Sequence, residues 1–257
     1  MKPVPTSLRL LFYVAFAAAA SGCGSGGGGG GAPAPAPVPT PPPAPAPAPG
    51  IAGAAQGFWS GQPNAQTFVS SVILAEGPVM QVSQTAGLTT LVIGTVNTQD
   101  ANFSVTGRSY NLNTGVQSAY AASGTVVPKG TLTFAPAAGA PGYALAYSSA
   151  YETPANLADV TGRWRASFSG GTLVLTLDVA GSGAITGSNT SGCNYSGSLA
   201  PHAGGVAVYD LRLTEACSNV AAVQFTGIAT LYANKTILSA GFATNDLSTA
   251  NAFQATR

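Results

Sequence analysis

Apolar and polar residues alternate along much of residues 51–257, and this period of two predicts β-strands rather than helices. The clearest example is the segment 172–180, in which Leu173, Leu175, Leu177 and Val179 share one face while Thr176 and Asp178 lie on the other. The segments 207–213 and 223–231 repeat the pattern. One apolar and one polar face per strand is typical of antiparallel sheet that covers a core on one side.

The pattern delimits about eight short strands in each half of this region. They are expected near 58–61, 68–76, 79–85, 89–97, 102–112, 117–127, 131–136 and 143–151, and then near 161–168, 172–180, 183–190, 194–200, 205–214, 222–232, 235–243 and 250–256. Eight strands in about 100 residues suit a small closed barrel, which leaves no sheet edge exposed. Two separate barrels and one merged sheet both remain compatible with this count.

The two halves also resemble each other at an offset of about 105 residues. Gly57-Phe58-Trp59 corresponds to Gly162-Arg163-Trp164, and the segment 123–127 corresponds to 226–230. Several short matches in the same order indicate a duplication. We therefore predict an all-β fold with two tandem, duplicated antiparallel units, each a small lipocalin-like or similar β-barrel.

The expected units are a first β unit at 51–152 and a second at 153–257. Between them, Thr153 followed by Pro154 predicts a helix N-cap and first helical position, hence a single-turn connector.

Residues 1–22 have the character of an export signal. Lys2 and Arg9 precede an apolar run over 10–20. Eleven residues span roughly 16 Å as a helix, too short for a hydrocarbon core of about 30 Å. The run therefore predicts a signal peptide rather than a membrane span.

The end of this signal reads Ala20-Ser21-Gly22-Cys23, which resembles the lipobox of bacterial lipoproteins, although that family prefers Leu where Ala20 stands. The resemblance implies that the Cys23 thiol is acylated, with palmitate among its chains, and becomes the mature N-terminus. More than one acyl chain makes such an anchor stable. Inner-membrane proteins of this family carry Asp after the cysteine, whereas this chain has Gly24 there. The resemblance therefore implies the outer membrane and does not decide between its periplasmic and its surface face. The alternative is an ordinary cleaved signal with a free thiol at Cys23.

Three cysteines are an odd number for an exported protein. If Cys23 carries lipid, Cys193 and Cys217 remain as one pair, and an oxidising compartment favours a disulfide between them. Such a disulfide would close a loop of about 24 residues and stabilise the fold by roughly 3–4 kcal/mol. The alternative is two buried reduced thiols. No metal site is expected, because His202 is the single histidine and no Cys-x-x-Cys pair occurs.

Residues 23–50 form a tether in this interpretation. Glycines dominate 24–31, and ten of the 19 prolines fall within 33–49. Alternating Ala and Pro favour polyproline II, which extends about 3.1 Å per residue. The composition predicts a flexible hinge followed by a semi-rigid stalk, or, alternatively, a docking segment for a proline-reading domain.

Charge is scarce: the chain has 9 Lys or Arg against 8 Asp or Glu and a net charge of +1. This is about a quarter of the usual charged share. It excludes a nucleic-acid binder that works by phosphate neutralisation. No nucleophile–His–carboxylate set or paired-carboxylate cleft is evident, and we expect His202 to lie in a solvated turn. We therefore expect neither an enzyme nor a cofactor.

Aromatic residues are the remaining candidates for ligand or partner contact. Trp59 and Trp164 open the two units at equivalent positions, where they could line a barrel mouth or plug the barrel as core. Tyr143, Tyr147 and Tyr151 recur at a spacing of four on one face of an expected strand. They could form a strip for a partner or pack between the two units.

The lipobox, the Gly/Pro tether, the Trp-led first strand and the glycine-containing hairpins together resemble small β-barrel lipoproteins of Gram-negative bacteria. The hairpin 226–241 is distantly similar to the barrels of transferrin-binding and factor-H-binding surface lipoproteins. The resemblance implies a lipid-anchored, non-enzymatic envelope protein that binds a protein or polymer, or has a structural role. The alternative is a lipocalin-like carrier of a small apolar ligand.

Overall fold

Antiparallel strands make up most of the described chain, which confirms the all-β expectation. The computed structural model describes residues 52–85, 88–135, 142–168, 171–218, 220–232 and 234–257. Cys23, the export signal and the tether lie outside these residues. Two closed eight-stranded barrels follow one another along the chain, so the two expected units are separate barrels and not one merged sheet.

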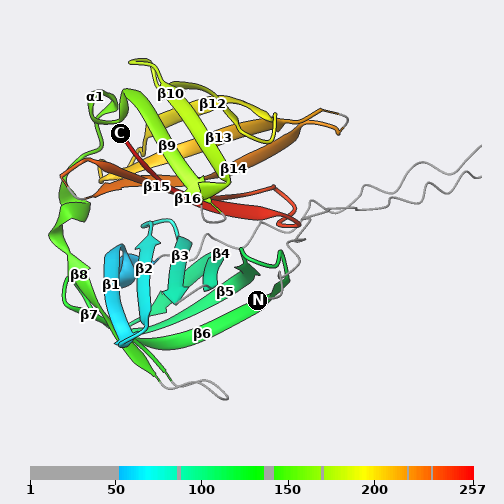
Figure 1. The fold of residues 1–257 in the computed structure, drawn as a ribbon. Helices are drawn as coiled ribbons and strands as arrows, with labels where there is room; N and C mark the ends of the chain where they lie inside the picture. Colours follow the sequence, from blue (N-terminus) through cyan, green and yellow to red (C-terminus); the bar gives the residue numbers. More distant parts are fainter. Residues whose placement is uncertain (1–51, 86–87, 136–141, 169–170, 219, 233) are drawn as a thin grey trace, which may run out of the picture. The chain divides into compact units, whose positions relative to one another are not determined.

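The first barrel joins β1 to β8 in chain order and closes by pairing β8 with β1 (Figure 1). Its strands are β1 Gly57–Asn64, β2 Thr67–Ile73, β3 Pro78–Thr85, β4 Leu88–Gln99, β5 Asn102–Asn111, β6 Gln117–Val127, β7 Thr131–Phe134 and β8 Tyr143–Ser148.

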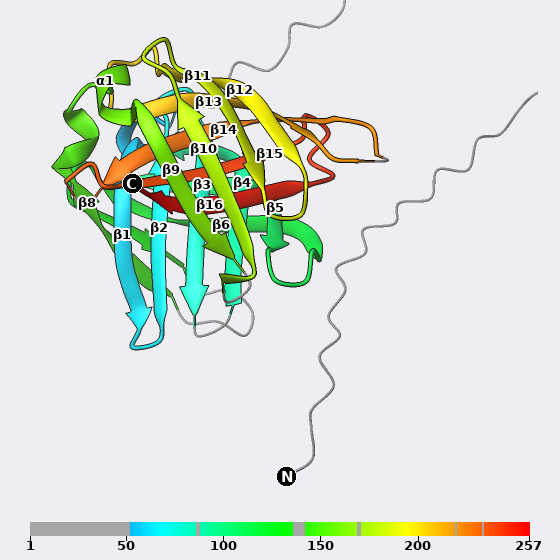
Figure 2. The same cartoon turned by 45° about the horizontal axis from the view of Figure 1, so that its top comes forward.

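The second barrel repeats this arrangement and closes by pairing β16 with β9 (Figure 2). Its strands are β9 Gly162–Phe168, β10 Leu173–Val179, β11 Ala184–Asn189, β12 Asn194–Pro201, β13 Val208–Ala216, β14 Val223–Tyr232, β15 Ile237–Ala243 and β16 Ala250–Thr256.

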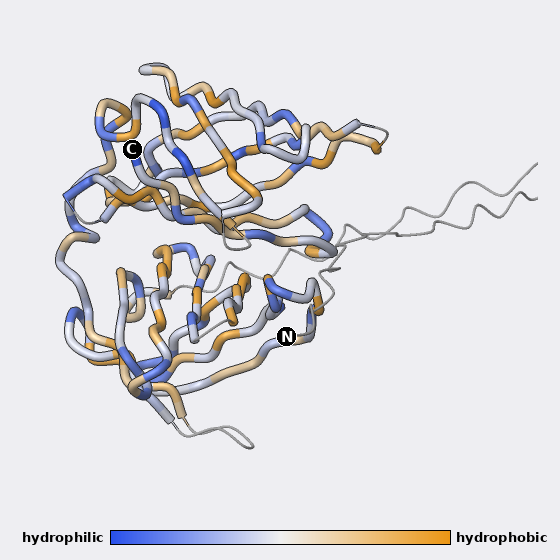
Figure 3. Tube along the Cα trace, in the orientation of Figure 1, coloured by the Kyte–Doolittle hydropathy of each residue, from blue (hydrophilic) through white to orange (hydrophobic). Residues whose placement is uncertain are grey.

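Each barrel is filled by the apolar residues of its strands, which alternate with polar ones along the chain (Figure 3). The second barrel encloses a continuous buried cluster that includes Leu177, Leu211 and Phe225. The first encloses a similar cluster but also a polar pair, in which Gln81 Nε2 donates to the hydroxyl of Tyr143 at 3.4 Å.

Two of the expected local details differ from the structure. The strand expected to run to residue 151 ends at Ser148, because the chain turns into the 3-10 helix η2 (Ser149–Glu152). The connecting helix α1 (Leu157–Val160) is capped by Asn156, whose side chain accepts from the amide of Ala158, and not by Thr153. Thr153 is extended, as expected for a residue that precedes proline.

The described residues from 52 to 257 form one compact unit, and a third buried cluster lies on the outer faces of both barrels. The first barrel contributes Met80 and Leu91, among others, and the second contributes Val208 and Ile228. The hydroxyl of Tyr110 donates to the carbonyl of Leu247 at 2.8 Å across the same boundary. In the described part of the chain, no helix is both long and apolar enough to cross a membrane.

Candidate functional site

The two tryptophans lie inside their barrels and are 1% and 0% exposed. The indole N–H of Trp59 donates to the carbonyl of Ala55 at 2.8 Å, and that of Trp164 donates to Val160 at 2.7 Å. Both acceptors lie four residues earlier, in the short helical turn before the first strand of each barrel. The structure therefore places these side chains in the core and offers no indole face for stacking on a ligand.

The three tyrosines do not form one strip. Tyr143 stacks on Phe134, and Tyr147 meets Trp59 edge to face, so both pack with the core of the first barrel. Tyr151 lies beyond the strand, in η2, and packs into the third cluster. Tyr147 also packs against this cluster, so two of the three tyrosines agree with the alternative of packing between the units. The chain leaves the strand before Tyr151, so the three side chains do not share one strand face.

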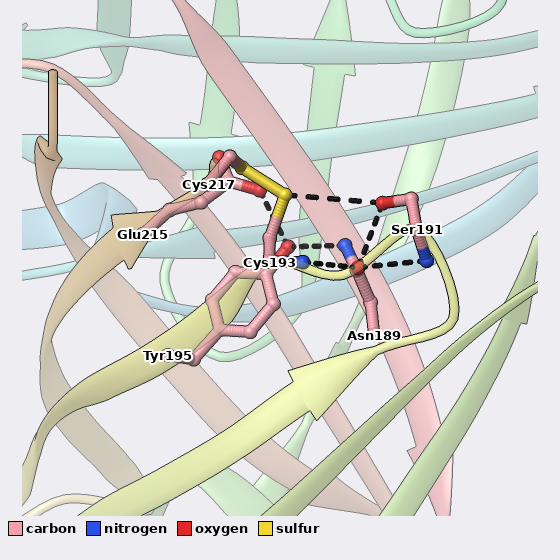
Figure 4. The surroundings of a disulfide bond; sticks show 6 residues. All are labelled: Asn189, Ser191, Cys193, Tyr195, Glu215 and Cys217. Carbon is pink, nitrogen blue, oxygen red and sulfur yellow. Dashed lines mark hydrogen bonds between the residues drawn. A yellow bond between two sulfur atoms is a disulfide. The ribbon is translucent and has the colours of Figure 1, made fainter. Parts of the chain in front are cut away.

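Cys193 and Cys217 form a disulfide, as the cysteine count predicts (Figure 4). Cys193 directly precedes β12 and Cys217 directly follows β13, so the bond joins the ends of two paired strands. The side chain of Asn189 orders the preceding turn by accepting from the amides of Ser191 and Cys193, each at 3.0 Å.

Glu215 lies beside this disulfide and accepts from the hydroxyl of Tyr195 at 2.5 Å. Burial, followed by the nearby carboxylate of Glu215, raises the pKa of Tyr195. Among the described residues, Cys193, Glu215 and Cys217 are the one group whose atoms are close enough to hold a metal ion. Both sulfur atoms are used by the disulfide, so this group offers no thiolate ligand.

His202 is not the solvated turn residue that its loop composition predicts, because its side chain is only 13% exposed. Its Nδ1 lies 2.8 Å from Asp210, and its Nε2 lies 3.5 Å from Glu76 of the first barrel. The imidazole therefore lies between two carboxylates, and its contact with Glu76 links the second barrel to the first. No nucleophile that could complete a catalytic set is bonded to His202 in the described residues.

A groove of about 520 Å³ lies on the outer face of β1, β2 and β3, and it is the best candidate for a binding site. Its apolar floor on this side is Phe58, Val72 and Met80, which are neighbours in register across the three strands. Ser60 and Ser70 form the next row. All five residues alternate with the inward-facing ones, so they point away from the barrel interior.

The opposite wall comes from β14, β15 and β16 of the second barrel. Thr230, Ser239 and Gln254 stand in one row across these strands, and all three line the groove. Tyr232 lies beside them, and its hydroxyl accepts from Gln254 Nε2 at 3.3 Å. Burial raises the pKa of Tyr232 above its ordinary value, which already lies well above neutral pH.

The groove carries almost no charge. Its charged lining residues are Lys235 and Asp159, and these two pair with each other at 2.8 Å. All its other lining residues are apolar or uncharged polar ones.

Sequence reasoning missed this groove because it looked for chemistry-bearing residues and not for strands with two apolar faces. A signal was present. Val79, Met80 and Val82 place apolar side chains on both faces of β3, and all three are buried. A barrel strand that is apolar on its outer face needs a cover outside the barrel.

Comparisons of the chain with protein-family models, with curated proteins and with solved structures find no match. The fold and its surfaces therefore carry the functional argument alone.

Proposed function

We propose that this protein is a lipid-anchored, non-enzymatic binding protein of the bacterial outer membrane, held by acylated Cys23 and separated from the membrane by the Gly/Pro tether. The observation that carries the binding role is the groove of about 520 Å³ outside the two barrels, whose two charged lining residues pair with each other. Its volume lies within the range of about 300–1,000 Å³ that is usual for small-molecule sites.

The second candidate, a lipocalin-like carrier with ligand inside a barrel, finds less support. The interior of each barrel holds a cluster of buried apolar side chains where such a ligand would lie. Leu132, Leu145 and Val96 in the first barrel, for example, are fully buried. Displacing packed core residues would cost about as much as the ligand's own burial gains.

Lipid attachment is tested by expressing the full chain in a Gram-negative host with radiolabelled palmitate. We expect label in the protein and recovery with the outer membrane. Cys23→Ser should lose both label and membrane association, whereas the double variant Cys193→Ser/Cys217→Ser should keep both. An unlabelled native chain, or a labelled Cys23→Ser chain, would refute the anchor.

The face of the membrane is tested with protease added to intact cells. Loss of the native chain from intact cells would assign surface display, and loss only after the outer membrane is opened would assign the periplasmic face. Both results agree with the proposal. Recovery of the Cys23→Ser chain in the cytoplasm together with the native chain would contradict export.

A further inference from the structure

We propose that the groove between the outer faces of β1–β3 and β14–β16 binds a neutral, mainly apolar small molecule that carries hydroxyl or carbonyl groups. This inference rests on the binding role proposed above and adds the class of ligand. It also places the ligand outside the barrels.

Exposed aromatic side chains gather at this groove. The exposed large apolar residues of the described chain are Phe68, Leu88, Val116, Val127, Val220 and Tyr232. Phe68 and Tyr232 are the two aromatic ones, 42% and 36% exposed, and both line the groove, one from each barrel. Exposed aromatic rings on facing walls supply large contact area for an apolar body at little entropic cost.

The charge of the lining selects against ions. Lys235 and Asp159 neutralise each other, and binding a charged ligand would require breaking that pair or burying an unpaired charge. A neutral ligand avoids this cost. Its affinity should therefore depend little on ionic strength.

Hydrogen-bonding groups on both walls define the polar part of the ligand. Ser60 and Ser70 offer hydroxyls on one wall, and Thr230, Ser239 and Gln254 offer hydroxyls and an amide on the other. These groups donate and accept without charge, which suits hydroxyl and carbonyl groups. The apolar floor of Phe58, Val72 and Met80 suits the remainder of the molecule.

The test uses the full chain with Cys23→Ser, because lipid would require detergent and micelles would take up the probe. The probe is N-phenyl-1-naphthylamine, a neutral aromatic amine whose fluorescence rises in apolar surroundings. We expect saturable binding to one site, changed less than twofold between low and high salt. The anionic dye 1-anilinonaphthalene-8-sulfonate should bind at least tenfold more weakly.

Groove variants locate the site. Phe68→Ser should weaken probe binding about tenfold, and Ser70→Trp, which fills the groove, should weaken it more. The matched control is Val127→Ser, which removes a 63% exposed apolar side chain from β6, outside the groove lining. The Val127→Ser variant should bind the probe with the same affinity as the chain whose groove is unchanged. Phe68 is exposed, so its variant should keep the far-ultraviolet circular dichroism spectrum even where Ser70→Trp fails to fold.

Each other outcome counts against the inference. Non-saturable binding, or equal loss in Phe68→Ser and Val127→Ser, would refute a site in the groove. Tighter probe binding after deletion of residues 33–49 would mean that the proline-rich tether competes with the probe, and hence that the tether occupies the groove. Palmitate labelling is measured on the native chain and does not depend on probe binding. Absence of probe binding would therefore not contradict the lipid anchor, and absence of palmitate label would not contradict the binding site in the groove.

Discussion

At the scale of single residues, Trp59 and Trp164 perform the same task in the two barrels. Each is buried in the core of its barrel, and its indole N–H bonds the first strand to the preceding helical turn. Arg257 adds a cation–π contact, with its guanidinium carbon 4.9 Å from the centre of the Trp164 ring.

Replacing either tryptophan with phenylalanine should lower the free energy of unfolding by about 1–3 kcal/mol, because a buried carbonyl loses its donor. Urea unfolding followed by circular dichroism measures this. The chain has two tryptophans, so the one that remains reports by fluorescence on the barrel that was not changed. Val127→Ser, which changes a side chain that is 63% exposed, is the control. Unchanged midpoints in both variants would contradict the role of the N–H bonds.

Asp246 should titrate abnormally. Its carboxylate accepts from the hydroxyls of Thr244 and Ser248 and from the amide of Ser248, and these bonds lower its pKa to about 2. Because the folded pKa is lower than the unfolded value of about 3.9, the turn is stabilised above about pH 4. The stabilisation is lost as the pH falls towards 2. Carboxyl NMR titration measures this, and a pKa near 4 would contradict it.

The sequence anticipated the residues of the core but not their polar partners. Alternation places Trp59 and Trp164 on inward faces, so the core interpretation could be reached. Their hydrogen-bond acceptors could not, because they depend on helical turns of only three and four residues, too short to leave a periodic signal. His202 illustrates the same limit, since Glu76 comes from the other barrel, 126 residues away.

At the scale of elements, the disulfide stabilises one specific pair of strands. Cys193 and Cys217 close the ends of β12 and β13, and the first barrel has no described counterpart. The double variant Cys193→Ser/Cys217→Ser should destabilise the second barrel by about 3–4 kcal/mol. Thermal unfolding with Trp164 as the single fluorophore, in a Trp59→Phe background, measures this. An equal loss for the first barrel, followed through Trp59 instead, would contradict a local effect.

Two glycines allow β4 and β5 to approach each other. Gly94 and Gly107 are paired in register, and a Cβ on either would collide with a backbone carbonyl, that of Thr106 or Ile93. Gly94→Ala or Gly107→Ala should therefore cost about 1–3 kcal/mol of folding free energy. Gly181→Ala is the matched control, because its Cβ would meet open space, and it should change stability by less than about 0.5 kcal/mol. Urea unfolding midpoints of the three variants measure these differences, and equal midpoints would contradict a close approach of β4 and β5 that depends on glycine.

Strands were the most predictable elements. All sixteen have both ends within three residues of those expected from alternation. The largest differences are three residues. One of them is at β1, which runs on to Asn64 because its hairpin with β2 continues through an irregular register after Gly61. Closure of each barrel could not be predicted from alternation, because it depends on pairing between residues that are far apart in the sequence, such as Trp59 and Tyr147. The repeat and the strand count favoured it, and the structure confirms it.

At the scale of the whole molecule, two filled barrels place the candidate binding surface on their outer faces. Duplication explains why: each unit closes its own core, so the remaining apolar residues, such as Met80 and Ile228, lie outside. Contact between barrels covers these residues. The groove is lined by neighbouring residues on the outer faces of the same strands. The apolar residues on both faces of β3 are its one local signal in the sequence.

The folded state should remain stable at moderately alkaline pH, because its tyrosines are protonated there, and should unfold cooperatively at higher pH. All eight tyrosines of the described chain have pKa values raised chiefly by burial, and that of Tyr151 reaches about 12. A folded pKa above the unfolded value of about 10 stabilises the native state below pH 10, and this stabilisation disappears as the pH rises towards 12. Absorbance at 295 nm should show the tyrosines of the native chain ionising at higher pH than those of the denatured chain, with a steep rise that coincides with loss of the circular dichroism signal. The denatured chain in urea should titrate gradually around pH 10. A gradual titration of the native chain around pH 10, without unfolding, would mean that the tyrosines of both barrels are open to water, and the packed interiors described here would be wrong.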